Sequence, residues 1–116
     1  MHELSLCEDL LEQVLTIAKQ NQAKYVETIT LDIGPLAGVE PLLLENAFSI
    51  LKIDTVAENA KLIIQSPPII VECVVCGQQS TVSANNLVCL ACQSNETQLV
   101  HGDELILVNL TLFTAS

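Results

Sequence analysis

Apolar residues recur at steps of three and four along residues 4–21, and this spacing predicts an amphipathic helix. The stripe consists of Leu4, Cys7, Leu11, Val14 and Ala18, and it is widened by Leu10, Leu15 and Ile17. Acidic residues near its start and Lys19 near its end suit the helix dipole. Because Cys7 lies within this stripe, we expect it to be a small buried apolar residue rather than a nucleophile.

The next two segments read as a strand and a second helix. Residues 26–33 alternate between apolar and polar side chains, which predicts a strand with one buried face formed by Ile29, Leu31 and Ile33. Turn residues follow in "GPLAG". A second apolar stripe over residues 41–53 predicts a helix, with Pro41 suited to its first turn.

Two further apolar segments predict strands on either side of a polar insert. Residues 61–66 form the first, which a Pro-Pro pair bends or ends, and "ELILVNLTLF" near the end of the chain forms the second. This order indicates an α+β fold with two helices packed on a three-stranded sheet and a zinc-ribbon-like lobe inserted before the last strand. The domains expected are 1–72 with 99–116, and 73–98.

Four of the five cysteines form a repeated motif inside the polar insert. The motif reads C-x2-C, twelve residues, then C-x2-C, and it comprises Cys73, Cys76, Cys89 and Cys92. Each such turn, called a knuckle below, can offer two thiolates to one ion, and two knuckles complete a tetrahedral shell. A structural Zn²⁺ is the expected occupant, while iron in a rubredoxin-type centre is chemically open. Disulfides or a thioredoxin-like pair fit less well, because the chain shows no export signal and the pairs flank a polar loop.

Charge and hydropathy exclude several classes of protein. Fourteen Asp and Glu against four Lys and Arg give a net charge of −10, which would repel nucleic acid. No apolar run reaches the ~20 residues that span a bilayer, and the acidic start does not resemble a secretory signal. We therefore expect a cytoplasmic protein that binds neither nucleic acid nor membrane. No catalytic triad, carboxylate pair or phosphate loop is apparent, so we expect no enzyme.

The opening "MHEL" places several metal-binding groups close together. These are the α-amine of Met1, the amide nitrogens that follow it and the imidazole of His2, with Glu3 next in the chain. A solvated tail without a role is the alternative. The predicted helix begins within two residues of His2, which weakens that alternative.

These motifs together resemble the HypA/HybF family, the nickel-insertion factors for nickel–iron hydrogenase maturation. The resemblance rests on "MHELSL", "ITLDIGPLAGVEP", the paired cysteine motifs and "GDELILVNL", and it extends over nearly the whole chain. One departure is Leu90, which stands where many members carry Pro inside the second knuckle. The departure removes no ligand.

The resemblance implies a nickel metallochaperone with two metal sites. His2 would be the required ligand of Ni²⁺, with Met1 and Glu3 beside it, and the four cysteines would hold Zn²⁺. Glu40 is a weaker candidate for nickel, because a carboxylate before a helix also suits a capping role. His101, the only other histidine, is either a further ligand or a surface residue. The resemblance also implies a GTPase of the nickel pathway and a hydrogenase large subunit as partners, possible service to urease, and a monomer or homodimer.

Two other functions compete with this reading. The knuckles alone would also fit a zinc-ribbon interaction or regulatory module with no nickel role. A rubredoxin-like electron carrier is the other, and bound iron would favour it.

Overall fold

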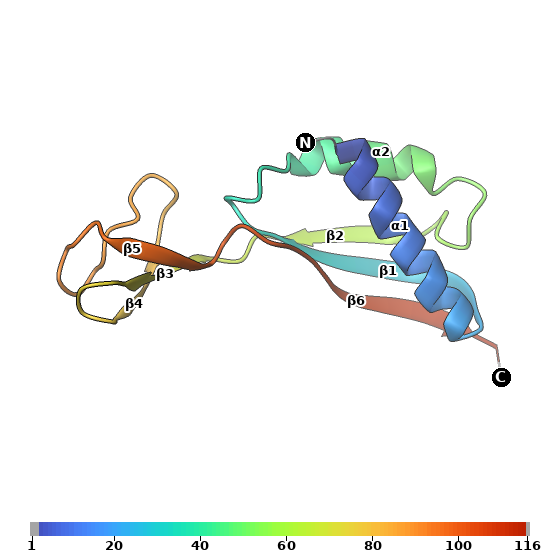
Figure 1. Cartoon of the computed structure of the whole chain (residues 1–116). Helices are drawn as coiled ribbons and strands as arrows, with labels where there is room; N and C mark the ends of the chain where they lie inside the picture. Colours follow the sequence, from blue (N-terminus) through green and yellow to red (C-terminus); the bar gives the residue numbers. More distant parts are fainter. Residues whose placement is uncertain (1–2, 116) are drawn as a thin grey trace. The chain divides into compact units, whose positions relative to one another are not determined.

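The computed structural model describes residues 3–115, and Met1, His2 and Ser116 lie outside the described residues. The chain divides into two compact units. The first comprises the described residues of Met1–Leu31, Val39–Gln65 and Ile106–Ser116, and the second comprises Asp32–Gly38 and Ser66–Leu105. Figure 1 shows the elements of both.

Helix α1 (Glu3–Gln20) follows the predicted stripe to within one residue at each end. Its buried residues are Cys7, Leu10, Leu11, Val14 and Ala18, and α1 packs against α2. Glu3 in the first turn and Lys19 in the last turn suit the helix dipole. Cys7 is fully buried, so the prediction of a buried apolar role is confirmed.

Helix α2 (Pro41–Leu51) begins at the predicted proline and ends two residues earlier than expected. Its N-cap is Glu40, whose side chain accepts a hydrogen bond from the backbone N–H of Leu42. Leu44 and Phe48, one turn apart, are the buried residues of this helix. Leu42 and Leu43 are exposed, which leaves part of an apolar helix in contact with solvent.

The first sheet contains β1 (Ala23–Ile33), β2 (Lys61–Gln65) and β6 (Leu105–Thr114) in the order β2-β1-β6. In Figure 1, β1 and β2 run in the same direction with α2 connecting them, and β6 runs the opposite way. A helical crossover is the usual connection for such a parallel pair. The predicted arrangement of two helices on a three-stranded sheet is confirmed.

Strand β1 is more buried than its alternating pattern predicts. Ile29, Leu31 and Ile33 are buried as expected, but Thr30 between them is also only 8% exposed. The reason is that β1 is the central strand, so its neighbours on both sides shelter it. Among the described residues, no buried side-chain polar atom lacks a hydrogen-bond partner.

The second unit contains a sheet whose individual strands the sequence pattern did not assign. Strands β3 (Ile69–Cys73), β4 (Gln79–Val82) and β5 (Thr97–His101) form it in the order β4-β3-β5, and both pairings are antiparallel. These strands are only four or five residues long, too short for a clear alternation. The predicted zinc-ribbon-like lobe is therefore confirmed, and the structure adds the bounds of its strands.

Two glycines bring the end of β1 against the chain that leaves β5. The N–H of Gly34 donates to the carbonyl of Glu104 (2.8 Å), and the N–H of Leu36 donates to the carbonyl of Gly102 (2.7 Å). A Cβ atom on Gly34 would collide with the backbone of Gly102. Glycine is therefore required at position 34 for this close approach.

No helix among residues 3–115 has the length and apolar character needed to cross a membrane.

Adjacent leucines of α2 provide a direct test of the core. Leu44 is fully buried, so Leu44→Ala should lower the free energy of unfolding by about 2–5 kcal/mol, through lost burial and the cavity left behind. Leu43 is 51% exposed, so Leu43→Ala should change it by about 0.5 kcal/mol or less. Urea unfolding followed by circular dichroism measures both. Equal losses would contradict the assigned helix orientation.

Candidate metal centre

The four cysteines of the two knuckles converge on one point in the second unit. Their sulfur atoms all lie within 4.8 Å of one another. The first knuckle, Cys73 to Cys76, forms the turn between β3 and β4, and the second, Cys89 to Cys92, lies in the segment between β4 and β5. Cys73 and Cys89 are buried, whereas Cys76 and Cys92 are exposed.

The two knuckles repeat the same backbone hydrogen bonds. In the first, the N–H of Gly77 donates to the carbonyl of Cys73 (2.9 Å); in the second, the N–H of Gln93 donates to the carbonyl of Cys89 (2.8 Å). The residue after each knuckle has a positive φ, 77° at Gly77 and 64° at Gln93. Glycine adopts this conformation without cost, but glutamine is strained there.

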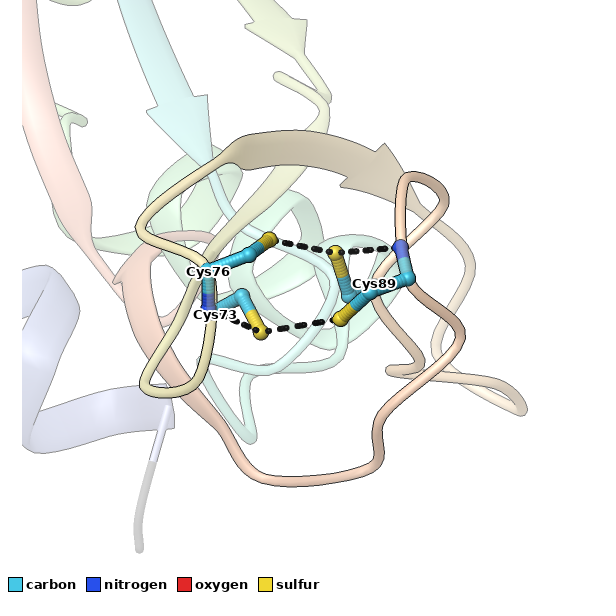
Figure 2. Close-up of side chains that lie close together, drawn as sticks. Cys73, Cys76 and Cys89 are labelled. Atoms are coloured by element: carbon cyan, nitrogen blue, oxygen red, sulfur yellow. Dashed lines mark hydrogen bonds between the residues drawn. The ribbon is translucent and has the colours of Figure 1, made fainter.

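Sulfur–sulfur distances match a tetrahedral metal site. Two contacts cross between the knuckles, Cys73 Sγ to Cys92 Sγ at 3.5 Å and Cys76 Sγ to Cys89 Sγ at 3.7 Å. Figure 2 shows these contacts. Four sulfurs bound tetrahedrally at a Zn–S distance of ~2.3 Å would lie about 3.8 Å apart. The residues present therefore fit a four-thiolate zinc ion, with no position left for substrate.

Backbone N–H groups stabilise the thiolate form of the first cysteine in each knuckle. The pKa of Cys89 is lowered to about 6, chiefly by the backbone N–H of Cys92 and then by that of Ala91. These groups lie 3.5 and 3.4 Å from its sulfur. The pKa of Cys73 is lowered in the same way, chiefly by the backbone N–H of Cys76. Both cysteines are thus prepared to bind a cation.

The second cysteine of each knuckle has a raised pKa while no cation is bound. A backbone N–H lowers the pKa of Cys92, but its contact with Cys73 and the loss of water around its sulfur outweigh that effect and raise the pKa to about 12. A backbone hydrogen bond likewise lowers the pKa of Cys76, but the loss of water around its sulfur and its contact with Cys89 outweigh it, so this pKa is also raised. A bound divalent cation would supply the charge that lets all four sulfurs ionise.

Two further side chains fasten the second knuckle to its surroundings, and sequence reasoning missed both. The hydroxyl of Ser80, a buried residue of β4, accepts a hydrogen bond from the N–H of Leu90 (3.1 Å). The hydroxyl of Thr97 in β5 donates to the carbonyl of Leu87 (2.7 Å). No sequence signal identifies these contacts, because each joins residues ten positions apart through the fold. The positive φ at Gln93 could have been predicted from the sequence, because Gln93 directly follows the second knuckle just as Gly77 directly follows the first.

In the first unit, a hydrogen bond connects the start of α1 to the start of α2. The backbone N–H of Glu40 donates to the Oε2 atom of Glu3 at 3.2 Å. Two of the sequence candidates for nickel are therefore neighbours, although 37 positions separate them in the chain. Met1 and His2, the other two candidates, lie outside the described residues.

The carboxylate of Glu40 has a structural role of its own. Its Oε1 atom accepts the N–H of Leu42 at 3.5 Å, which caps α2. Glu40 thus has the helix-capping role that was the alternative to nickel binding, although the hydrogen bond is long.

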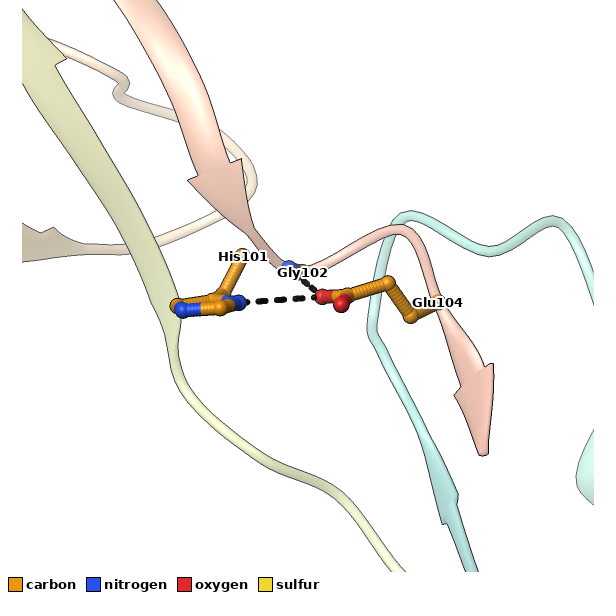
Figure 3. Close-up of polar contacts among 3 residues, drawn as sticks. All are labelled: His101, Gly102 and Glu104. Carbon is orange, nitrogen blue, oxygen red and sulfur yellow. Dashed lines mark hydrogen bonds and ion pairs between the residues drawn. The ribbon is translucent and has the colours of Figure 1, made fainter. Parts of the chain in front are cut away.

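His101 lies on the surface of the second unit. Its Nδ1 atom is 3.3 Å from Oε1 of Glu104, and the same oxygen accepts the N–H of Gly102 at 3.4 Å (Figure 3). The exposure agrees with the surface alternative for this histidine.

Cys7 belongs to neither site. Burial, aided by the charge of Glu8, raises the pKa of its thiol to about 11. It therefore remains protonated and unreactive at neutral pH.

The fold and the cysteine cluster define a small α+β metal-binding protein with a ribbon-like four-cysteine lobe. Comparison with known families identifies it more closely. Residues 1–112 match the family model for hydrogenase/urease nickel incorporation, metallochaperone, HypA.

Curated relatives agree with this match along nearly their full length. The chain is 40% identical over 112 residues to the hydrogenase maturation factor HypA of Aquifex aeolicus, covering 97% of both chains. It is 41% identical over 114 residues to that of Nitrosospira multiformis, covering 98% of this chain and 99% of the relative.

Solved structures are similar as well. The solution structure of the Ni metallochaperone HypA from Helicobacter pylori superposes with a TM-score of 0.73 at 27% identity, covering 99% of this chain and all of that one. A second solution structure, of HypA protein, gives 0.77 at 26% identity, covering 99% and 98%. The chain therefore belongs to the HypA family of nickel metallochaperones for hydrogenase maturation.

The positive φ at Gly77 yields a prediction about metal retention. A methyl group at this position meets no atom within 4 Å, so Gly77→Ala acts through backbone strain of about 1–2 kcal/mol. We expect Zn²⁺ affinity, measured by competition with a chelator, to fall roughly tenfold.

Gln93→Gly is the matched control, since it relieves the same conformation in the other knuckle. It should leave the affinity unchanged or raise it. If Gly77→Ala and Gln93→Gly lowered the Zn²⁺ affinity equally, the positive φ after each knuckle would not be what limits metal binding.

Proposed function

We propose that this chain carries Ni²⁺ as cargo, bound by its first residues, and delivers it for hydrogenase maturation. The ligands are the α-amine of Met1, the amide nitrogens that follow it and the imidazole of His2, with Glu3 and Glu40 as weaker participants. The observation that carries the proposal is the family match, which starts at residue 1. The bond between Glu3 and Glu40 supports it, because it fastens the residue next to His2.

The donor set suits nickel as a transferable ion. Amine, imidazole and deprotonated amide nitrogens favour a square-planar geometry, which Ni²⁺ accepts. The amine and the imidazole have ordinary pKa values of about 7.7–8.0 and 6.5, so protons compete with the metal near neutral pH. Binding should therefore weaken as the pH falls from 8 to 6, which allows release without a large conformational change.

We propose Zn²⁺ as the resident ion of the four-cysteine centre. The support is the donor set, four sulfurs at near-tetrahedral separations. When bound, the ion would cross-link the two knuckles, and its closed shell would leave no position for catalysis. The predicted domains, 1–72 with 99–116 for nickel and 73–98 for zinc, follow this division of roles.

The remaining parts of the proposal follow from the family. The family is one of metallochaperones, so we infer that the chain is not an enzyme. We infer a nickel-pathway GTPase and a hydrogenase large subunit as partners, a cytoplasmic location, and a monomer or homodimer. The family description also includes urease, which makes urease a second possible destination for the nickel. No comparison favours a regulatory zinc-ribbon module without a nickel role.

Nickel titration of the untagged protein by calorimetry between pH 6 and 8 tests the proposal. The unmodified chain should bind Ni²⁺. His2→Ala, His2→Gln and an N-terminal extension should each abolish binding, because they remove the imidazole or convert the amine to an amide. Circular dichroism and the metal content of the cysteine centre should not change.

His101→Ala is the matched control, because it removes the only other histidine, one that lies exposed on the second unit. It should keep at least half of the nickel affinity. Undiminished binding by the extended chain, or by His2→Ala, would refute the proposed site.

A further inference from the structure

The cysteine centre pairs its sulfurs in a particular way. Both short contacts cross between knuckles, Cys73 with Cys92 at 3.5 Å and Cys76 with Cys89 at 3.7 Å. Within each pair one cysteine is buried and the other is exposed. A small solute can therefore approach one cysteine of each pair, while the other is sheltered.

We propose that this centre is also a site of reversible oxidation, where a peroxide converts the four cysteines into two disulfides that cross between the knuckles, Cys73–Cys92 and Cys76–Cys89. The peroxide is the oxidant, and in the metal-bound centre, where all four sulfurs are ionised, the exposed cysteines react first because the peroxide reaches them first. The proposal rests on the proposed zinc occupancy for this order of reaction and for the metal release described below; the pairing of the sulfurs rests on the distances.

Each disulfide forms in two balanced steps. The sulfur of the exposed cysteine attacks a peroxide oxygen, the O–O bond breaks, and a sulfenic acid and one water form. The sulfur of the buried partner then attacks the sulfenic sulfur, the S–S bond forms, and a second water leaves. Two sulfurs lose two electrons in total, and one hydrogen peroxide gains them.

Distance favours the crossed pairing. A disulfide needs a sulfur–sulfur distance of about 2.05 Å, so a gap of 3.5 Å must close by roughly 1.5 Å. Small rotations of two side chains can supply this movement.

As a consequence, the metal cross-link between the two knuckles is replaced by a disulfide cross-link. Conversion of one pair removes two of the four ligands, so the centre loses its metal while a covalent bond still joins the knuckles. Reduction would restore the thiolates. Cys7 should take no part, because it is fully buried in the first unit and carries a protonated thiol.

The experiment treats zinc-loaded full-length protein with hydrogen peroxide, follows released Zn²⁺ with a chromogenic chelator, and maps disulfides in unreduced digests. No Lys or Arg follows Lys61, so trypsin cannot separate the cysteines; elastase at Val74 or Val75 and chymotrypsin at Leu87 or Leu90 can.

We expect one zinc ion released per chain, the two crossed disulfides, and a free thiol at Cys7 as the internal control. A reductant with added Zn²⁺ should restore metal binding. Disulfides confined within the knuckles, or sulfinic and sulfonic acids without disulfides, would overturn the proposal.

Two further measurements test the order of oxidation and the pairing of the sulfurs separately. A sulfenic-acid trap such as dimedone should label Cys76 and Cys92, and preferential labelling of the buried cysteines would overturn the proposed order. The same mapping on metal-free protein tests the sulfur pairing by itself. A protein that is purified without zinc would then contradict the proposed resident ion, while the pairing would still be decided by the disulfide map.

Discussion

The second unit depends on the meeting of four sulfur atoms at one point. Its buried apolar residues are few, chiefly Ile69, Val71, Cys73 and Cys89, and its strands are short. A segment of this size cannot bury enough apolar surface to hold itself together, and small domains of this kind usually need a metal or disulfides. A metal ion bound as proposed would cross-link the two knuckles and supply what the core lacks, which would couple metal binding to the folding of this unit.

The first unit is held together differently, and this difference allows two separate roles. Its helices and the central strand β1 share an aliphatic core around Val14, Leu31, Leu44 and Phe48. That core fixes the start of α1, where Glu3 binds the backbone of Glu40. The principal ligands proposed for nickel, Met1 and His2, thus precede a helix that packs through apolar residues. Under the proposed function, nickel would enter and leave without loss of the fold.

Sequence reasoning recovered the features that have a local signature. The 3.6-residue period gave both helices, and the cysteine spacing gave the metal centre before its geometry was known. The strands of the zinc-ribbon-like lobe were not assigned individually, because segments such as "QSTV" and "TQLVH" are too short to show alternation. Contacts such as Ser80 with Leu90 or Glu3 with Glu40 join distant parts of the chain, so only the fold reveals them. The burial of Thr30 likewise follows from the central position of β1 in its sheet.

Amide hydrogen exchange before and after removal of the bound metal by a chelator tests the separation of the two units most directly. The account predicts that the amides of β3 and β4 lose protection on chelation, whereas those of α1, α2 and the Ala23–Leu31 part of β1 retain it. Simultaneous loss of protection in both units would contradict the account, and so would a second unit that stays fully protected without its metal.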